Sequence, residues 1–402
     1  MNILRMVNPV MPYAWGSKTF IAELSGKRVD DLQPQAELWM GAHPAASSQI
    51  QNGVILADLN YIIAEDPNDF LGSRIAHAYH DHLPFMLKVL AAEQPLSLQV
   101  HPDSEKAKEG FTRENKLGIP LTAPIRNYKD SFHKPELLVA LTEFHALCGF
   151  RDYSELTHLL KKYLHKIHMA EIDCFIDNPT DSNLKEMFGF LLRAKAETKT
   201  ELLENFMQHV HSEMPADPQE QLVNEWSAQL YKLYPNDVGV LAPLLMNIVV
   251  LKPGQGIYLE SGILHSYLKG AGMEIMANSD NVLRGGLTPK HVDPDELLRV
   301  LNWSGHKADP LRAKKLSATE YVFQTPALEF VLSRIRHSTN KRTELQPSQS
   351  PEILFCYEGG FEVENCSQIL SLDKGQSLFV PYEVEGYAVQ GKGLIFRARC
   401  NV

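Results

Sequence analysis

Cysteine is scarce and irregularly spaced in this sequence. The 402 residues include five cysteines, which are scattered and never form a CxxC pair. The spacing offers no cysteine-based metal site, and it is typical of proteins from a reducing compartment.

Long hydrophobic runs are also missing. The longest apolar stretch, LAPLLMNIVVL at 241–251, is too short to span a bilayer and predicts a buried strand or helix. Residues 1–17 contain neither an uninterrupted apolar run nor a cleavage signature. We therefore expect a cytoplasmic protein without a membrane partner.

The sequence has no excess of positive charge. Its formal net charge is −10, which argues against a general nucleic-acid binder. It also lacks a GxSxG motif, a Walker loop and a complete GxGxxG motif. An anionic substrate would therefore need basic residues that are gathered locally.

Three sequence textures follow one another along the chain. Residues 1 to about 150 consist of short apolar runs broken by Gly, Pro, Asn and Asp, which predict strands. Between 152 and 235 apolar residues recur at helical spacing, and Asp217-Pro218 gives the last helix an N-cap followed by proline. Further on we expect strands from about 238, a helix at 293–303, a linker at 304–320 and strands at 320–402.

Two segments of the strand-rich parts resemble each other. LKPGQGIYLESGILHSY (251–267) and LDKGQSLFVPYEVEGYA (372–388) align without gaps. A turn that ends in glycine and leads into an aliphatic–aromatic–aliphatic strand is a unit that jelly rolls repeat; chance similarity of two turns is the alternative. His265 corresponds to Gly386, so we expect a histidine-based site only in the first barrel.

A polar stripe marks the stretch PLSLQVHPDS (95–104). Side chains alternate along a strand, so Ser97, Gln99 and His101 share one face, and aliphatic residues occupy the other. Taken alone, the stripe fits best a half-exposed strand with its polar face in water. It would also suit the interior of a closed barrel that binds a ligand.

Two further segments favour the interior site. FHKPELLVAL (132–141) places Lys134 and Glu136 on one face at the start of an apolar strand, where an unpaired carboxylate would be costly to bury. GILHSYLKG places His265 among aliphatic residues. The two imidazoles, the carboxylate and the Gln99 amide would suit zinc, although Mn, Fe or Co would suit the same ligands.

A cluster of charged residues follows His265. The turn-rich stretch 272–291 contains Glu274, Asp280, Arg284 and Lys290. An arginine and a lysine beside a metal would suit a phosphorylated substrate. Salt bridging at the surface, which is common and often nearly neutral in energy, is the alternative.

These motifs resemble those of the type I phosphomannose isomerase family. The similarity runs through YAWGS (13–17), AELWMGAHP, LPFMLKVL, LSLQVHPD, GFTRENKLGIPL, NYKDSFHKPE, LHSYLKG and MANSDNVLRGGLTPK (276–290). It is weak across 152–235 and only general after 320.

The resemblance implies a mainly β fold with an α-helical insertion. A cupin-type jelly-roll catalytic domain would be interrupted by a helical domain and followed by a second jelly roll. We place the catalytic domain at 1–151 plus 236–317, the helical insertion at 152–235, and a C-terminal jelly roll without a metal site at 318–402.

The resemblance also implies a zinc-dependent aldose–ketose isomerase that interconverts D-mannose 6-phosphate and D-fructose 6-phosphate through a cis-enediol. One Zn²⁺ per chain would be held by Gln99, His101, Glu136 and His265. The family's catalytic arginine falls on Arg284. Other expected site residues are Lys134, Glu274 and His133 for proton transfer, with Ser97, Lys290, Asp280 and Lys88 for substrate contact.

Two other functions stand as alternatives. A cupin dioxygenase would use iron with open coordination positions, which the Gln99 ligand and the Arg/Lys cluster argue against. A sugar-binding cupin without catalysis would need neither an electrophilic metal nor a base. We expect a monomer whose partner is a phosphorylated hexose.

Overall fold

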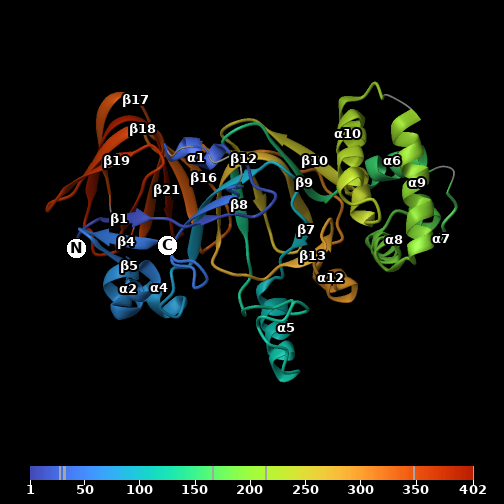
Figure 1. Ribbon diagram of the computed structural model, residues 1–402, viewed down its shortest axis with the longest axis horizontal. Helices are drawn as coiled ribbons and strands as arrows, with labels where there is room; N and C mark the ends of the chain where they lie inside the picture. Colours follow the sequence, from blue (N-terminus) through green and yellow to red (C-terminus); the bar gives the residue numbers. More distant parts are fainter. Residues whose placement is uncertain (27–28, 30–32, 165–166, 213–214, 347–348, 402) are drawn as a thin grey trace.

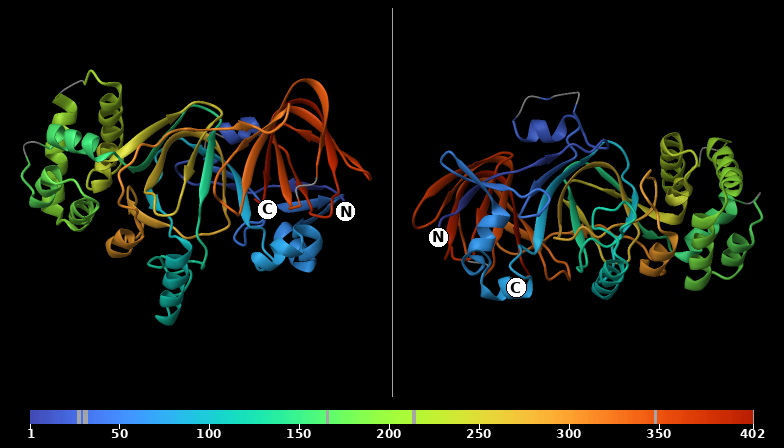
Figure 2. Two further views of the ribbon diagram at one scale, coloured as in Figure 1. Left: turned by 180° about the vertical axis from the view of Figure 1, so that it is seen from behind. Right: turned by 60° about the horizontal axis from the view of Figure 1, so that its bottom comes forward.

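The computed structural model describes residues 1–26, 29, 33–164, 167–212, 215–346 and 349–401. These residues form three lobes in a row: a helical lobe, a central β lobe and a second β lobe that holds both chain termini (Figure 1). Figure 2 shows the helical lobe and the second β lobe at opposite ends of the central one. The expected fold class, mainly β with a helical insertion, is confirmed.

The long strand β12 (His265–Ala277) organises the central lobe. Its N-terminal part pairs with β7 (Leu98–Val100) and β9 (Phe144–Phe150), and its C-terminal part pairs with β6 (Phe85–Ala92) and β8 (Glu136–Ala140). By changing partners along its length, β12 joins two walls around one interior. The other strands of this 11-stranded sheet are β2 (Val10–Met11), β3 (Glu37–Met40), β10 (Met246–Leu251), β11 (Gln255–Leu259), β13 (Leu283–Gly286) and β14 (Leu311–Arg312).

The second β lobe contains a ten-stranded sheet built mostly from the C-terminal part of the chain. Its C-terminal strands are β15 (Lys314–Lys315), β16 (Glu320–Phe323), β17 (Val331–Leu345), β18 (Glu352–Glu364), β19 (Ile369–Asp373), β20 (Ser377–Val380) and β21 (Tyr387–Arg399). β17, β18 and β21 are the long strands, and the pairings among these seven strands are all antiparallel.

Three strands from the start of the chain complete this second sheet. β1 (Leu4–Val7) pairs with β20 on one side and with β4 (Gln49–Asn52) on the other, and β5 (Ile55–Asp58) follows β4. The assignment of 1–151 to the catalytic domain stays a prediction, and these three strands pair with the sheet of the second β lobe. Alternation in a sequence predicts a strand, but it does not say which sheet edge the strand will join.

The helical block forms the expected insertion. Its helices are α6 (Tyr153–Tyr163), α7 (Ala170–Asp177), α8 (Asp181–Arg193), α9 (Ala196–Ser212) and α10 (Pro218–Leu233). The N-cap expected at Asp217 is confirmed, because its carboxylate accepts hydrogen bonds from the N–H groups of Gln219 and Glu220 at 2.8 and 3.1 Å. The apolar faces share one core with Leu98 and Val100, the aliphatic side of β7.

The chain returns from the insertion through a short helical segment. The 3₁₀-helix η1 (Val238–Leu241) and α11 (Ala242–Leu245) lead into β10. The apolar stretch 241–251 is thus partly helix and partly strand, and nearly all of it is buried. Within the described residues, no helix combines the length and apolar character needed to cross a bilayer.

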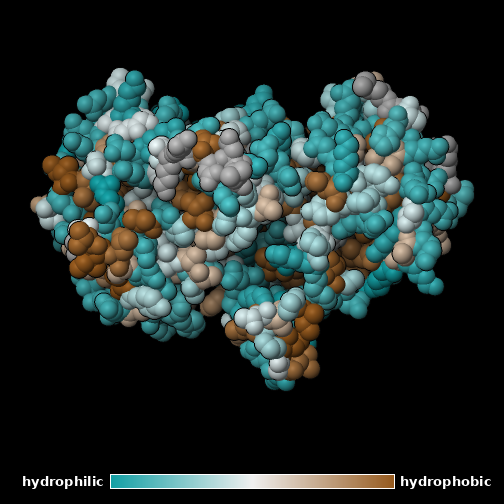
Figure 3. Space-filling model, viewed as in Figure 1, coloured by the Kyte–Doolittle hydropathy of each residue, from teal (hydrophilic) through white to brown (hydrophobic). Residues whose placement is uncertain are grey.

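Several helices lie where only strands were expected. The longest is α5 (Ser104–Lys116), which projects from the central lobe (Figure 1) and is capped by Asp103, whose carboxylate accepts from the Lys106 N–H at 2.8 Å. Hydrophilic residues cover most of the face seen in Figure 3, but apolar ones gather on this projection, where Leu117 and Leu121 are exposed. The remaining helices are α1 (Phe20–Leu24), α2 (Leu59–Glu65), α3 (Pro67–Leu71), α4 (Ser73–Ala78) and α12 (Pro294–Val300), the last lying in the helix expected at 293–303.

The two segments that resemble each other adopt the same turn. Gly254 and Gly375 have φ angles of 85° and 81°, a region that glycine occupies without strain. The Gln255 side chain accepts from the Lys252 N–H at 2.8 Å, and Gln376 repeats this contact with the Asp373 N–H at 3.0 Å. The echo therefore reflects a repeated structural unit rather than a chance similarity.

Candidate active site

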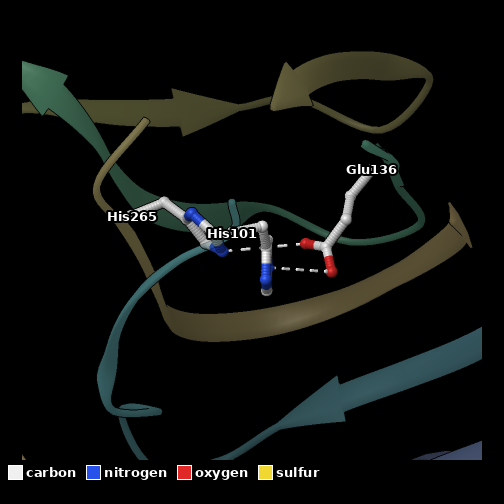
Figure 4. Close-up of side chains that lie close together, drawn as sticks. All are labelled: His101, Glu136 and His265. Carbon is white, nitrogen blue, oxygen red and sulfur yellow. Dashed lines mark ion pairs between the residues drawn. The ribbon is translucent and has the colours of Figure 1, made fainter. Parts of the chain in front are cut away.

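Strand ends bring three Lewis bases together in the central lobe. His101 directly follows β7, Glu136 begins β8, and His265 begins β12 (Figure 4). The Nε2 atom of His101 lies 3.2 Å from Glu136 Oε1, and that of His265 lies 3.7 Å from Glu136 Oε2. All three side chains are buried, and one potential ligand atom from each lies within 4.8 Å of the others. Among the described residues, this is the group of histidine, cysteine and carboxylate side chains with a geometry suited to a metal ion.

Hydrogen bonds to backbone carbonyls fix the tautomer of both imidazoles. His101 Nδ1 lies 2.7 Å from the Asn281 carbonyl oxygen, and His265 Nδ1 lies 2.9 Å from that of Ile263. A carbonyl oxygen only accepts, so each Nδ1 carries a proton, and in the neutral ring Nε2 presents a lone pair. Within the described structure, the buried Nε2 of His101 has no hydrogen-bond partner.

The charge states match this arrangement of lone pairs. Burial lowers the pKa of His265 to about 4, so its ring is neutral at pH 7. Burial alone would raise the pKa of Glu136, but the nearby Lys134 ammonium helps to hold it well below its usual value. A carboxylate and two unprotonated nitrogens that face one another repel unless a cation lies between them. The donor set therefore fits a divalent metal ion.

Gln99 lies beside the three buried residues. It is opposite His265 in the β7–β12 register and opposite Arg284 in the β7–β13 register. Its Nε2 donates to Ser97 Oγ at 3.2 Å, which leaves the amide oxygen as the atom that it can offer to a cation. Ser97 and Gln99 line the cavity described below, whereas Leu98 and Val100 pack on the helical insertion, as strand alternation predicts.

A cavity of about 600 Å³ opens next to this cluster. Its wall contains most of the residues that the sequence singled out: Lys88, Ser97, Gln99, Lys134, Glu136, His265, Glu274, Asp280, Arg284 and Lys290. Four of these residues are cationic, but Lys88 and Lys134 pair with carboxylates of the same wall, so Arg284 and Lys290 supply the positive charge that an anionic ligand requires.

Glu274 and Lys88 form a buried ion pair in the cavity wall. They are direct partners in the β12–β6 register, and Lys88 Nζ lies 3.4 Å from Glu274 Oε2 and 3.8 Å from Glu37 Oε1. Burial raises the pKa of Glu274 to about 7, against the opposing effect of Lys88. Burial lowers the pKa of Lys88, but Glu37 and Glu274 outweigh it and raise the net value. Glu274 can therefore gain or lose a proton near neutral pH.

Arg284 lies in β13, and Lys290 lies on the loop that follows it. Burial lowers the pKa of Arg284, and burial together with Arg284 lowers that of Lys290. Neither side chain forms a salt bridge with any described residue. Lys134, by contrast, lies 3.1 Å from Glu136, and Asp280 lies 3.3 Å from His43.

His133 does not face the cavity. Its Nε2 lies 2.7 Å from Glu329 Oε1, and it is absent from the cavity wall that the neighbouring Lys134 lines. Its expected role in ring opening stays a prediction. Alternation explains why the two neighbours differ in direction, because consecutive side chains of an extended segment point to opposite sides.

Some cavity residues were not predicted from the sequence. Glu37, Trp39, Tyr13 and Trp15 come from the N-terminal segments, and Tyr234 comes from the end of α10. Glu37 and Trp39 are two residues apart on β3 and so share one face of the strand. The Trp39 indole N–H donates to Glu37 Oε2 at 2.7 Å. A carboxylate within the apolar run ELWM was the available signal. Tyr234 carried no signal, because its place depends on how the insertion packs.

Three models of protein families match separate parts of the chain. The model described as "Phosphomannose isomerase type I, catalytic domain" matches residues 3–153, and "Phosphomannose isomerase type I, helical insertion domain" matches 162–246. "Mannose-6-phosphate isomerase, cupin domain" matches 332–400.

Curated relatives and solved structures extend the same similarity to the whole chain. The mannose-6-phosphate isomerase of Escherichia coli (strain K12) is 40% identical over 98% of both chains. That of Homo sapiens is 34% identical and covers 73% of this chain and 72% of its own. A variant of phosphomannose isomerase from Salmonella typhimurium superposes with a TM-score of 0.93 at 36% identity, and a zinc-bound mannose 6-phosphate isomerase with 0.92 at 36%, each covering 100% of both chains.

Proposed function

The chain belongs to the type I phosphomannose isomerase family, and on this premise we propose that the cavity beside His101, Glu136 and His265 interconverts D-mannose 6-phosphate and D-fructose 6-phosphate. The observation that carries the proposal is the convergence of two unprotonated imidazole nitrogens on one buried carboxylate, next to a cavity with four cationic side chains. The enzyme is an aldose–ketose isomerase with a zinc cofactor.

One zinc ion would be held by His101 Nε2, His265 Nε2, the Glu136 carboxylate and the Gln99 amide oxygen. When bound, zinc supplies a Lewis acid that polarises the carbonyl of the open-chain sugar. The Asn281 and Ile263 carbonyls keep both imidazoles in the required tautomer.

The cationic side of the cavity would bind the phosphorylated end of the sugar. Arg284 and Lys290 provide charges that no described carboxylate neutralises, and Ser97 adds a hydroxyl. Lys88 and Asp280 would contact the sugar from the same wall. Because several charged side chains of the cavity wall are buried, they would interact with the ligand more strongly than in bulk water.

Isomerisation moves a proton between C2 and C1 through a cis-enediol, and Glu274 and Lys134 are the candidates for carrying it. The pKa of Glu274, raised by burial to about 7, suits a group that must take and return a proton at neutral pH. Lys134 is paired with Glu136 at 3.1 Å. Exchange of solvent protons at C2 in E274Q and K134M separates the two: loss in one variant identifies the carrier, and retained exchange in both would exclude both.

The alternative functions are not favoured. The relatives that match over the full chain are isomerases, and a cupin dioxygenase would require open positions for oxygen at an iron centre. A sugar-binding cupin without catalysis would have no use for the polarising site and the titratable Glu274 beside it.

The division into domains is also a proposal. We assign the catalytic domain to the central lobe, with 236–317 and most of 1–151, and the insertion to 152–235. The C-terminal jelly roll at 318–402 is completed by β1, β4 and β5. We further propose that the chain acts as a cytoplasmic monomer, in keeping with its scattered cysteines and its own complete cavity.

Removal and return of metal test this function. The purified protein is dialysed against a chelator, metals are restored one at a time, and fructose 6-phosphate formation from mannose 6-phosphate is followed. We expect activity to disappear and to return with one equivalent of zinc. Activity that is insensitive to chelation would contradict the proposal, and metal-dependent oxygen uptake would favour the dioxygenase.

A further inference from the structure

The turn that follows the helical insertion contacts the segment that carries Arg284 and Lys290. Asp237 lies between α10 and η1, and its Oδ2 accepts a hydrogen bond from the backbone N–H of Leu287 at 2.7 Å. Its Oδ1 accepts from the Gly239 N–H at 2.8 Å. One carboxylate therefore ties the start of η1 to the loop after β13.

The loop has an unusual conformation at this contact. Leu287 is fully buried and has a φ of 55°, in the left-handed region that leucine rarely adopts. Gly286 before it has a φ of 139°, and a Cβ built on it would lie 2.7 Å from Asp237 Oδ1. Such a backbone persists where its surroundings hold it, and Asp237 contacts it directly.

The backbone conformation at Leu287 affects where the side chains of Arg284 and Lys290 lie in the cavity wall. Arg284 comes three residues before Leu287 and Lys290 three residues after it, and all three line the cavity wall. The ladder with β7 is irregular between Arg284 and Gly286, so sheet pairing alone does not fix the loop. The described structure shows no salt bridge that would hold either cation in place.

We infer that Asp237 is a positioning residue, through which the turn after the helical insertion places Arg284 and Lys290 for binding the phosphate group of the substrate. The inference rests on the proposed function of these two cations. It gives the insertion a direct part in the active site, since Tyr234 from the same turn also lines the cavity.

The test compares D237A with a matched control, D217A. Asp217 caps α10 in the same insertion through two backbone N–H groups, but it does not line the cavity. In D237A we expect the KM for mannose 6-phosphate and the dissociation constant of inorganic phosphate, measured by calorimetry, to rise roughly 10- to 100-fold. Zinc content should stay at that of the unaltered chain. D217A should lower the melting temperature and leave both constants unchanged.

A second variant covers the case in which D237A does not fold. D237N has the same shape and keeps one acceptor for the two N–H groups, so both constants should rise by a smaller factor. A lower melting temperature with unchanged KM and unchanged phosphate binding in D237A or D237N would overturn the inference. If the unaltered chain has no isomerase activity, the proposed function fails, whereas phosphate binding still tests Asp237.

Discussion

At the scale of single residues, the site depends on three buried groups that are unfavourable together without a cation. The His101 and His265 rings are held by carbonyls so that their lone pairs face the Glu136 carboxylate. Burying such groups without compensation costs free energy. The retention of all three in one buried cluster is best explained by coordination.

Replacing Glu136 by Gln should remove the anionic ligand while nearly preserving shape. A metal of this kind contributes several kcal/mol to transition-state stabilisation, so kcat/KM should fall by about a thousandfold or more. Zinc content, measured by elemental analysis, should fall in parallel. E143Q is the matched control, because Glu143 is an exposed carboxylate near the same strands. An E136Q protein that retained one zinc ion and near-normal activity would contradict the assignment.

The raised pKa of Glu274 predicts a pH dependence of activity. Its carboxyl is protonated below about pH 7 and ionised above it, so kcat/KM should rise with pH and level off above about 7. We call this rise the acidic limb of the pH profile. Bound zinc should move the limb to lower pH. The stability of the fold should change with pH in the opposite direction to activity, because a raised pKa means that the folded protein favours the protonated carboxyl. The contribution of Glu274 to stability is complete below its usual pKa of 4.5 and is lost as the pH rises through about 7.

Two variants check that Glu274 is responsible for the limb. K88M removes the positive charge that opposes the rise, so the limb should move to higher pH. E274Q should abolish the limb in a kcat/KM profile. An unchanged limb in E274Q would assign it to another group.

The direction of side chains along the strands was the feature of the site that could be predicted from the sequence. Alternation along β7 put Ser97 and Gln99 on one face, and both line the cavity. The same principle turns His133 away from the side that Lys134 occupies and toward Glu329. Glu37 and Tyr234 were missed because their roles depend on the packing of segments that are distant in sequence.

At the scale of elements, the repeated glycine turn occurs in two different surroundings. A Cβ on Gly254 would meet the movable end of Arg334, whereas a Cβ on Gly375 would lie 2.5 Å from the backbone oxygen of Leu24. Each Ala substitution incurs a left-handed backbone cost of about 1–2 kcal/mol, and the Gly375 variant also incurs the clash.

G375A should therefore unfold at a clearly lower temperature than G254A. Thermal unfolding of the two variants beside the unaltered chain measures the difference. Equal melting temperatures, or a lower value for G254A, would show that the clash at Gly375 is relieved by movement of α1.

Helices of the insertion were easier to predict than those of the N-terminal part. Apolar spacing and the Asp217 cap identified α6, α8, α9 and α10 because each buries one continuous face, whereas the short α7 was not predicted. By contrast, α5 is largely polar and projects from the lobe, so it has no broad apolar face to reveal it; its signal was the Asp103 cap alone.

At the scale of the whole molecule, β1 connects the ends of the chain. It lies between β20 and β4, and the Arg5 side chain donates to the Gln376 amide oxygen at 3.0 Å. Strand-like and helix-like patterns in the sequence separated the lobes, but they did not reveal that the N-terminal strands join the C-terminal sheet. That pairing is between residues more than 370 positions apart, such as Leu4 and Phe379.

Deletion of residues 1–7 should expose the edges of β20 and β4. Open edges favour association with other chains, so we expect a lower melting temperature and aggregation in sedimentation experiments. Deletion of residues 1–2, which precede β1, is the control and should behave like the full chain. Unchanged stability after the longer deletion would show that β1 is dispensable.

The most direct test of the proposed metal site is a crystal structure of the zinc-loaded protein with diffraction data collected on both sides of the zinc absorption edge. One anomalous peak is expected, about 2.0–2.2 Å from His101 Nε2, His265 Nε2 and a Glu136 oxygen, with the Gln99 amide oxygen completing the shell. A peak elsewhere, or none between these side chains in an active zinc-loaded enzyme, would contradict the assignment.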